Sequence, residues 1–383
     1  MFFYSYYCLP DDKNAGKLGT FANNCLGSCL VKGTLMSNPY LQNLSSLHPK
    51  DDGLNFVSVF CGGGGLDLGF SLAGFKPLFS SDIIEHGCNT VRQNLPGHLV
   101  EAHDITELSG GYVLDKVNKD VDFVIGGPPC QSFSILGQRG SISDPRGQLV
   151  FEYARFINEI SPKGFLFENV PGILTVNKGK DWEELKEFFR KETGYFLSTA
   201  KLNSADYGVP QLRNRVFLIG MKDRPFTDWP DAEFFPEGSL EVGNGLCQYL
   251  PSKFALEAMD NAPNHVKRVH SERVEGRYRE IPQGGRCQVD RTDRIDAEKP
   301  SGTVLVGSGG GGGRPFIHPY EHRHLTVREA ARLQSFPDWW EFSGPGTWQY
   351  RQVGNAVPPI MAMKIAEKLK SHIVFSQSVK KAS

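Results

Sequence analysis

The sequence lacks three features that would set it apart from an ordinary globular protein. No apolar run approaches the roughly 18 residues that a membrane-spanning helix requires, so no membrane association is expected. The opening MFFYSYYCLPDD is aromatic but has neither the basic start nor the long apolar core of a secretory signal. An excess of one charge is also missing, because 42 Lys and Arg balance 43 Asp and Glu. That balance neither favours nor excludes nucleic acid, since a local basic groove would suffice.

A disulfide framework is missing as well. The eight cysteines are scattered through 383 residues without paired spacing, which is typical of free thiols in a reducing cytoplasm. Cys8, Cys25 and Cys29 lack the second pair or histidine partner that a zinc site needs. We therefore expect a cytoplasmic protein without a bound metal.

The chain divides into regions of different pattern. Residues 1–53 have little periodicity, which predicts a partly disordered or loosely packed extension with no assignable role. From Leu54, helical patterns alternate with apolar runs, namely LNFVSVF, KPLFSSD, VDFVIGG, GFLFENV and RVFLIG. This alternation predicts an α/β fold with a parallel sheet covered on both faces. Ligands of such folds bind beyond the carboxyl ends of the strands.

The alternation stops after Gly220, and residues 223–317 are rich in Pro, Gly and charge. Helical patterns return in 318–383, where TVRE at 326–329 is a capping box that predicts a helix start. We expect a body formed by 54–222 and 318–383, interrupted by a smaller irregular domain.

Three consecutive strand ends carry residues suited to a nucleotide-like ligand. The segment FCGGGGLDLGF, residues 60–70, is a glycine turn between a strand and a helix, but it departs from the G-x-G-x-x-G pattern at Asp67. Asp82 ends the second strand, where an acid can accept hydrogen bonds from two ribose hydroxyls, and Asp104 follows the third. Any one acid at a strand end is more often a helix cap than a ligand-binding residue. Together they favour an adenosine-containing cofactor other than NAD.

A cysteine and charged residues follow the next strands. In FVIGGPPCQSF, two prolines fix the approach to Cys130 and place its thiol at the ligand edge. Glu168 closes the neighbouring apolar strand, which suggests either a general acid facing Cys130 or a structural salt bridge. Arg213 and Arg215 are two positions apart on a strand, so we expect both guanidiniums to converge on one target. A solvated strand start is the alternative for these arginines.

Six blocks in this order resemble the DNA (cytosine-5)-methyltransferase family, typically bacterial enzymes paired with a restriction endonuclease. The blocks are FCGGGG, GGPPCQSFS, ENV, QLRNR, RLQSFPDWW and QVGNAVPP, and the similarity runs from about Leu54 to about Leu369. The resemblance implies an S-adenosylmethionine-dependent, Rossmann-like sheet with a smaller irregular target-recognition domain. It also implies methylation at C5 of a cytosine flipped out of a specific double-stranded DNA sequence.

The resemblance gives individual residues their roles. Cys130 would attack C6 of the base, and Glu168 would hydrogen-bond or protonate N3. Arg215 would hold O2, with Arg213 supporting the site. The residues matching the family's S-adenosylmethionine pocket are Phe60, Gly63, Gly65, Asp82, Ile83, Asp104, Ile105, Pro129, Leu149, Asn355 and Val357. Many relatives carry Glu at the position of Asp82 and a larger aromatic residue at that of Ile83. This chain therefore has a shorter acid and a smaller apolar side chain for contacts with adenosine.

The resemblance also assigns regions. Residues 131–148 would close over the flipped base, with motion at Gly137 and Gly140. Residues 262–294 hold eight Lys and Arg against five Asp and Glu and would read DNA. Thr303 would support the junction of the two domains. The implied partners are double-stranded DNA and a restriction endonuclease acting on the same site, and we expect a monomer.

Three alternatives compete with this interpretation. A transfer-RNA cytosine methyltransferase would carry a Cys-Phe-Thr tripeptide in its recognition region, and this chain has none. An inactive DNA-binding relative would have lost residues such as Cys130 and Glu168, which are intact. A nicotinamide-dependent dehydrogenase would leave the thiol–acid pair unexplained.

Overall fold

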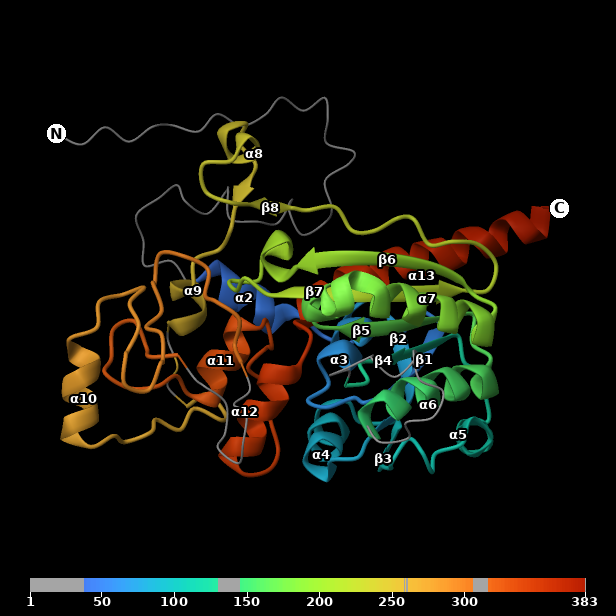
Figure 1. The fold of residues 1–383 in the computed structure, drawn as a ribbon, viewed down its shortest axis with the longest axis horizontal. Coiled ribbons are helices and arrows are strands. Elements are labelled where there is room, and N and C mark those ends of the chain that lie inside the picture. Colours follow the sequence, from blue (N-terminus) through green and yellow to red (C-terminus); the bar gives the residue numbers. More distant parts are fainter. Residues whose placement is uncertain (1–37, 130–144, 258, 260, 306–315, 383) are drawn as a thin grey trace.

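A seven-stranded sheet forms the centre of the computed structural model, which describes residues 38–129, 145–257, 259, 261–305 and 316–382 (Figure 1). The strand order is β3-β2-β1-β4-β5-β7-β6. The strands are β1 (Leu54–Val59), β2 (Phe75–Asp82), β3 (Leu99–Ala102), β4 (Phe123–Gly126), β5 (Gly164–Asn169), β6 (Phe196–Asn203) and β7 (Asn214–Met221).

The sheet is mixed. Neighbouring strands from β3 to β5 pair in parallel, as the sequence predicts, whereas β7 runs antiparallel to both β5 and β6. The expectation of a wholly parallel sheet is therefore wrong at this edge. Strand β6 was not among the expected strands because, as the edge strand, it has no fully buried residue.

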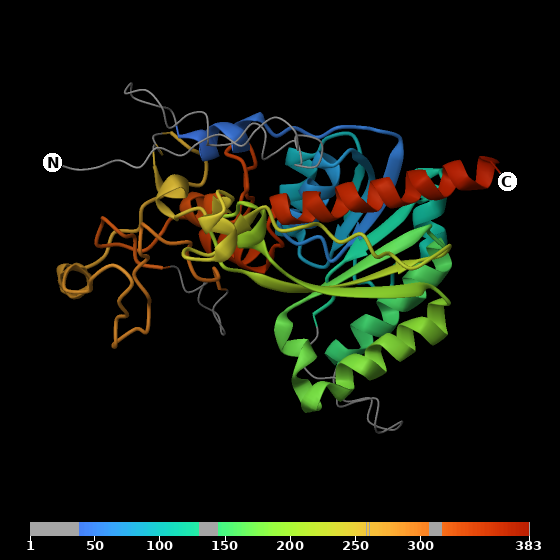
Figure 2. The same cartoon turned by 90° about the horizontal axis from the view of Figure 1, so that it is seen from above.

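Helices cover both faces of the sheet (Figure 2). One face packs against α3 (Gly65–Leu72), α4 (Glu85–Asn94) and α13 (Pro359–Ala382), and the other against α5 (Gly110–Val117), α6 (Pro145–Ile160) and α7 (Lys180–Thr193). Successive side chains of one strand pack on opposite faces of the sheet. Phe165 and Phe167 join the α6 and α7 side, whereas Leu166 joins the α3 and α13 side. Such two-sided burial explains the continuous apolar runs in the sequence.

The C-terminal segment returns to the body through α11 (Val327–Leu333), α12 (Gly346–Asn355) and α13. The predicted capping box is confirmed, because Thr326 and Glu329 bond reciprocally at the start of α11. Helix α13 lies directly on α3, where a Cβ at Gly69 would come 2.3 Å from the Cβ of Ala362. Glycine is required there because the two backbones approach so closely.

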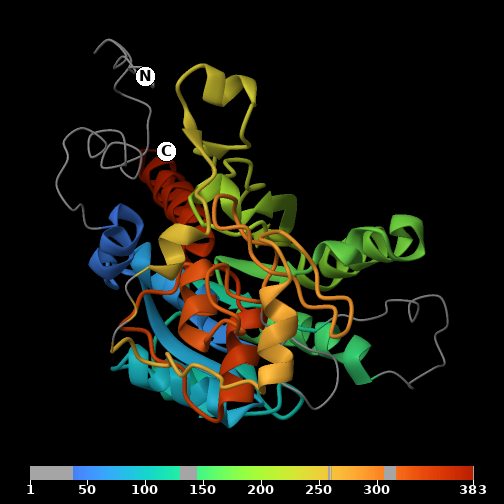
Figure 3. The same ribbon diagram turned by 90° about the vertical axis from the view of Figure 1, so that its left-hand side faces the viewer.

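The part of the chain after β7 has little regular structure. Its elements are β8 (Phe234–Phe235), α8 (Leu240–Gly243), β9 (Cys247–Gln248), α9 (Lys253–Leu256) and α10 (Glu272–Arg279). Helix α10 lies on the side of the molecule away from the sheet (Figures 1 and 3). Its Tyr278 belongs to a small apolar cluster with Cys287 and Ile317. Short 3₁₀ helices η2 (Pro171–Leu174), η3 (Val176–Gly179) and η4 (Ser204–Tyr207) complete the body.

The helix α2 (Pro39–Ser46) departs from the expectation of a loose extension before Leu54. The hydroxyl of Tyr40 is buried and donates to the carbonyl oxygen of Arg332 at 2.6 Å. Asn38 Nδ2 donates to the carbonyl oxygen of Phe254 at 2.6 Å. Helix α2 therefore connects α9 to α11, and loose packing is wrong for this segment.

Leu44 tests that attachment. Its side chain is 3% exposed in the main core, so Leu44→Ala is expected to lower the free energy of unfolding by about 2 kcal/mol. The midpoint of urea unfolding measures the effect. Gln42→Ala, an exposed position on the same helix, is the control and should change little. Equal midpoints for the two variants would contradict the packing of α2.

Two further expectations concern thiols and membranes. Cys61, Cys88, Cys247 and Cys287 are free, as expected for the cysteines within the described ranges. In those same ranges, no helix combines the length and the apolar character that crossing a bilayer would need.

Candidate active site

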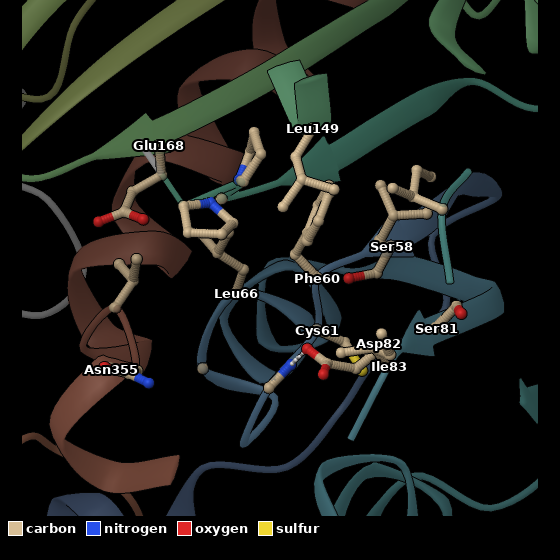
Figure 4. Close-up of a pocket in the computed structure, with 18 of the residues that line it drawn as sticks. Ser58, Phe60, Cys61, Leu66, Ser81, Asp82, Ile83, Leu149, Glu168 and Asn355 are labelled. Atoms are coloured by element: carbon tan, nitrogen blue, oxygen red, sulfur yellow. Dashed lines mark hydrogen bonds between the residues drawn. The ribbon is translucent and has the colours of Figure 1, made fainter. Parts of the chain in front are cut away.

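A cavity of about 750 Å³ opens at the carboxyl ends of the central strands (Figure 4). Its volume lies within the roughly 300–1,000 Å³ typical of small-molecule sites. Segments that follow β1, β2, β3, β4 and α12 line it, together with the end of β5 and the start of β7. The lining includes every residue predicted for the cofactor, namely Phe60, Gly63, Gly65, Asp82, Ile83, Asp104, Ile105, Pro129, Leu149, Asn355 and Val357.

The glycine loop after β1 is held by close packing. Phe60 adopts a left-handed φ of 57°, which is rare for an aromatic residue and marks a strained turn at the cavity wall. A Cβ at Gly65 would come 2.2 Å from the carbonyl oxygen of Val357. Glycine at this position therefore lets the segment before α13 reach the loop. Asn355, near the other end of the sequence, therefore lines the same cavity as the loop that follows β1.

Asp82 fastens the loop to the end of β2. Its Oδ2 accepts from the backbone N–H of Gly62 at 2.9 Å, and its Oδ1 accepts from that of Ile84 at 2.8 Å. Burial raises the pKa of the Asp82 carboxyl, and the N–H donors oppose this shift. Asp104 similarly accepts from the N–H of Thr106 at 2.9 Å. Both acids thus cap a turn and also line the cavity, and their expected contacts with a cofactor stay a prediction.

Glu168 and Arg215 form an ion pair at one side of the cavity. Because β7 runs antiparallel to β5, its start lies beside the end of β5. Arg215 Nε lies 2.8 Å from Glu168 Oε1, and the two side chains are 8% and 12% exposed. Burial raises the pKa of Glu168, opposed mainly by the guanidinium of Arg215. A carboxyl that retains its proton more readily than usual suits a general acid.

Arg213 does not line the cavity. Its guanidinium is 0% exposed and donates to the carbonyl oxygens of Val304 at 3.0 Å and Gly354 at 2.6 Å. The expected convergence of Arg213 and Arg215 is therefore wrong. The reason is that β7 begins at Asn214, so Arg213 precedes the strand. The rule that residues two positions apart share one face of a strand therefore does not apply to this pair.

Cys130 lies outside the described residues, as do Gly137 and Gly140 of the expected closing loop. The approach to Cys130 is described, however. A Cβ at Gly127 would come 2.7 Å from Glu168 Oε2, so glycine leaves room for the acid.

Asn169 is a positioning residue that the sequence analysis left without a role. Its Nδ2 donates to the carbonyl oxygen of Pro128 at 3.1 Å, and its side chain is 6% exposed. This bond ties the end of β5 to the segment that leads from β4 to Cys130. The block ENV contains the residue, but only the pairing of β4 with β5 shows what it holds.

Trp340 is a second residue whose role the sequence did not reveal. Its side chain is 0% exposed, and its Nε1 donates to the carbonyl oxygen of Gly63 at 3.2 Å. A Cβ at Gly64 would come 2.6 Å from the ring. The block RLQSFPDWW therefore packs against the glycine loop through Trp340 and supports it.

Comparisons with known proteins assign the chain to a family. The profile of the family described as C-5 cytosine-specific DNA methylase matches residues 54–371. The chain belongs to this family. The enzyme class expected from the sequence, a DNA (cytosine-5-)-methyltransferase, is thereby confirmed.

Individual relatives cover most of the methyltransferase. It is 39% identical over 325 residues to Type II methyltransferase M1.HphI of Haemophilus parahaemolyticus, covering 82% of this chain and 86% of the relative. It is 34% identical over 375 residues to Type II methyltransferase M.DdeI of Desulfomicrobium norvegicum, covering 82% and 88%.

Solved structures share the fold. A candidate DNA modification methyltransferase encoded within a prophage of E. coli superimposes with a TM-score of 0.69 at 28% identity, covering 83% of this chain and 99% of that chain. The Dnmt2 methyltransferase of S. pombe, at 20% identity and a TM-score of 0.60, covers 83% and 99%. The expected methyltransferase sheet is thus confirmed.

The basic segment 262–294 of the methyltransferase contains both structural and exposed arginines. Arg294 is 5% exposed and donates to the carbonyl oxygen of His318 at 2.9 Å, so it is a buried structural residue. Arginines at the surface of the segment are Arg268, Arg273, Arg279, Arg286 and Arg291. Thr303 Oγ1 donates to the carbonyl oxygen of Leu212 at 2.8 Å, and its expected support of a domain junction stays a prediction.

Proposed function

We propose that this methyltransferase transfers a methyl group from S-adenosylmethionine to C5 of a cytosine flipped out of double-stranded DNA. The single observation that supports the proposal best is the Glu168–Arg215 pair, which shares one cavity with all the expected cofactor residues. The names of the Type II relatives support a role as the methylase of a restriction-modification system, with a cognate endonuclease acting on the same site. For a bacterial methylase of this kind, which acts on DNA in the cytoplasm, we expect a cytoplasmic location.

The residues around the cavity fit the proposed cofactor. Backbone N–H groups of the glycine loop and the helix start suit its carboxylate, and Asp82 suits its ribose hydroxyls. Apolar side chains such as Phe60 and Ile105 suit the adenine. S-adenosylmethionine, when bound, supplies the methyl group, and the protein must present the cytosine to it.

Activation of the base is the work of the chain's own residues. Cytosine C5 is a poor nucleophile, so Cys130 Sγ forms a bond to C6 while Glu168 protonates or hydrogen-bonds N3. Arg215 holds the cytosine O2 and keeps Glu168 oriented. After C5 accepts the methyl group, C5 loses its proton to a base, the Sγ–C6 bond breaks to release the Cys130 thiolate, and N3 returns any proton that it took from Glu168.

Access to the base requires extrusion from the duplex, because a stacked C6 is out of reach of a thiol. Exposed arginines of 262–294, such as Arg268, Arg273 and Arg291, are suited to guanine edges or phosphates. Arg294 is left out of this group because it is buried.

Methyl transfer from radiolabelled S-adenosylmethionine tests the proposal. Duplex plasmid DNA is expected to be labelled, and transfer RNA is not. Bisulfite sequencing of plasmid from cells that express the protein then identifies the modified site. Labelling of transfer RNA alone would support the RNA methyltransferase instead. DNA binding without any labelling would support the inactive relative.

A further inference from the structure

Asp67 is a buried acid at the floor of the cavity that the mechanism above does not use. It lies in the first turn of α3, lines the cavity and is 0% exposed. Its Oδ1 accepts from Ser80 Oγ at 2.7 Å and its Oδ2 accepts from Ser58 Oγ at 3.0 Å. These hydroxyls, on β2 and β1, fix the carboxylate between the strands and the glycine loop. Burial raises the pKa of Asp67 to about 6, so the group is mostly ionised above neutral pH.

The charges around the cavity do not balance. Within the described lining, the basic side chains are Arg215 and His103, and they pair with Glu168 and Glu101 at 2.8 and 3.0 Å. The other lining acids are Asp67, Asp82 and Asp104, and no ion pair to them occurs among the described residues. A cavity with this excess of acids favours a cationic ligand.

Asp67 differs from the other two acids in its place. Asp82 ends β2 and Asp104 follows β3, where backbone N–H groups hold them and where ribose and adenine are expected. Asp67 instead lies behind the glycine loop, fixed by two neutral hydroxyls and shielded from solvent. A charge in such a low-dielectric position acts on ligand charge without direct contact.

We propose that the negative charge of Asp67 stabilises the positively charged sulfonium of S-adenosylmethionine relative to the neutral thioether of S-adenosylhomocysteine. This inference rests on the proposed function. Transfer of the methyl group removes the sulfonium charge, and with it the attraction to Asp67. Asp67 thereby favours binding of the methyl donor over retention of the product.

Calorimetric titration of three ligands into the full-length protein at pH 8 tests this role. The ligands are S-adenosylmethionine, S-adenosylhomocysteine and sinefungin, whose amino group places a positive charge where the sulfonium lies. Asp67→Asn is expected to weaken binding of the two cationic ligands about tenfold and binding of S-adenosylhomocysteine less than about twofold. Asparagine can keep the hydrogen bonds to both Ser58 and Ser80, because its amide offers one acceptor and one donor group and a serine hydroxyl can either donate or accept.

A matched control is Asp181→Asn. Asp181 is also a buried acid in the first turn of a helix, 2% exposed in α7, but it does not line the cavity. Its replacement should leave the ratio of the affinities unchanged. Asp67→Ser, a smaller neutral variant, makes the same comparison if the Asn variant fails to bind S-adenosylhomocysteine.

Two outcomes separate this inference from the function on which it rests. Equal weakening of all three ligands by the neutral variants would overturn it, because Asp67 would then only position the loop. Failure of the wild-type protein to bind any of the ligands would instead contradict the proposed function.

Discussion

Glu168→Gln is expected to lower the single-turnover rate of methyl transfer by about 10²- to 10⁴-fold, with the affinity for S-adenosylmethionine nearly unchanged. The physical reason is that glutamine can donate a hydrogen bond to N3 of the cytosine but cannot deliver a proton. Burial raises the pKa of Glu168, which keeps the protonated form available at a higher pH than for an exposed acid.

The pH profile distinguishes proton donation from simple positioning. The fold raises the pKa of Glu168, so the wild-type rate should fall as the pH rises through that pKa and the acid loses its proton. The Gln variant should lack this fall, because its amide donates at every pH. Glu184→Gln, at an exposed position on α7, is the control. Wild-type rates in the Glu168 variant would contradict the role of this acid.

Arg213→Met is expected to lower the free energy of unfolding by about 3 kcal/mol, the largest stability effect in this account. The guanidinium is fully buried and donates to the carbonyl oxygens of Val304 and Gly354. Removing it leaves both carbonyls buried without these donors, at about 1–3 kcal/mol each. The midpoint of urea unfolding at unchanged slope measures the loss.

Arg213→Lys provides the comparison for this prediction. A single ammonium can reach one of the carbonyls but lacks the fork that reaches both, so an intermediate midpoint is expected. A Met variant as stable as the wild type, yet inactive, would show that Arg213 acts on the substrate rather than in the interior.

Much of the body could be predicted from sequence because its strands are buried on both faces. Continuous apolar runs mark β1, β4 and β5, and the cavity at their carboxyl ends follows from the parallel arrangement. The edge strand β6 carries no such run, since it is partly exposed throughout. The direction of β7 was also unreadable, because a strand's orientation depends on its partners and not on its own residues.

The residues of the candidate site likewise fall into those that could be predicted from the sequence and those that could not. The acids at the strand ends could be predicted one by one, because each follows a recognisable strand. The carboxyl ends of parallel strands meet at one edge of the sheet, and this edge forms the cavity. Asn169, Trp340 and Asp67 bond to partners on other elements that are distant in the sequence, so no local pattern indicated their contacts. The packing of α2 was missed for a related reason. Tyr40 and Leu44 are too few to give a helical stripe, and the buried hydroxyl of Tyr40 bonds to Arg332 of α11, which is distant in the sequence.

The central claim is that Cys130 bonds to C6 of an extruded cytosine, and duplex DNA with 5-fluorocytosine at the methylated position tests it most directly. Fluorine cannot leave C5 as a proton does, so the reaction should stop with the protein joined to DNA. In the presence of S-adenosylmethionine we predict a denaturation-resistant complex, with the crosslinked peptide containing Cys130. Complete methyl transfer to ordinary cytosine at that site, without any trapped complex on the fluorinated duplex, would contradict the account.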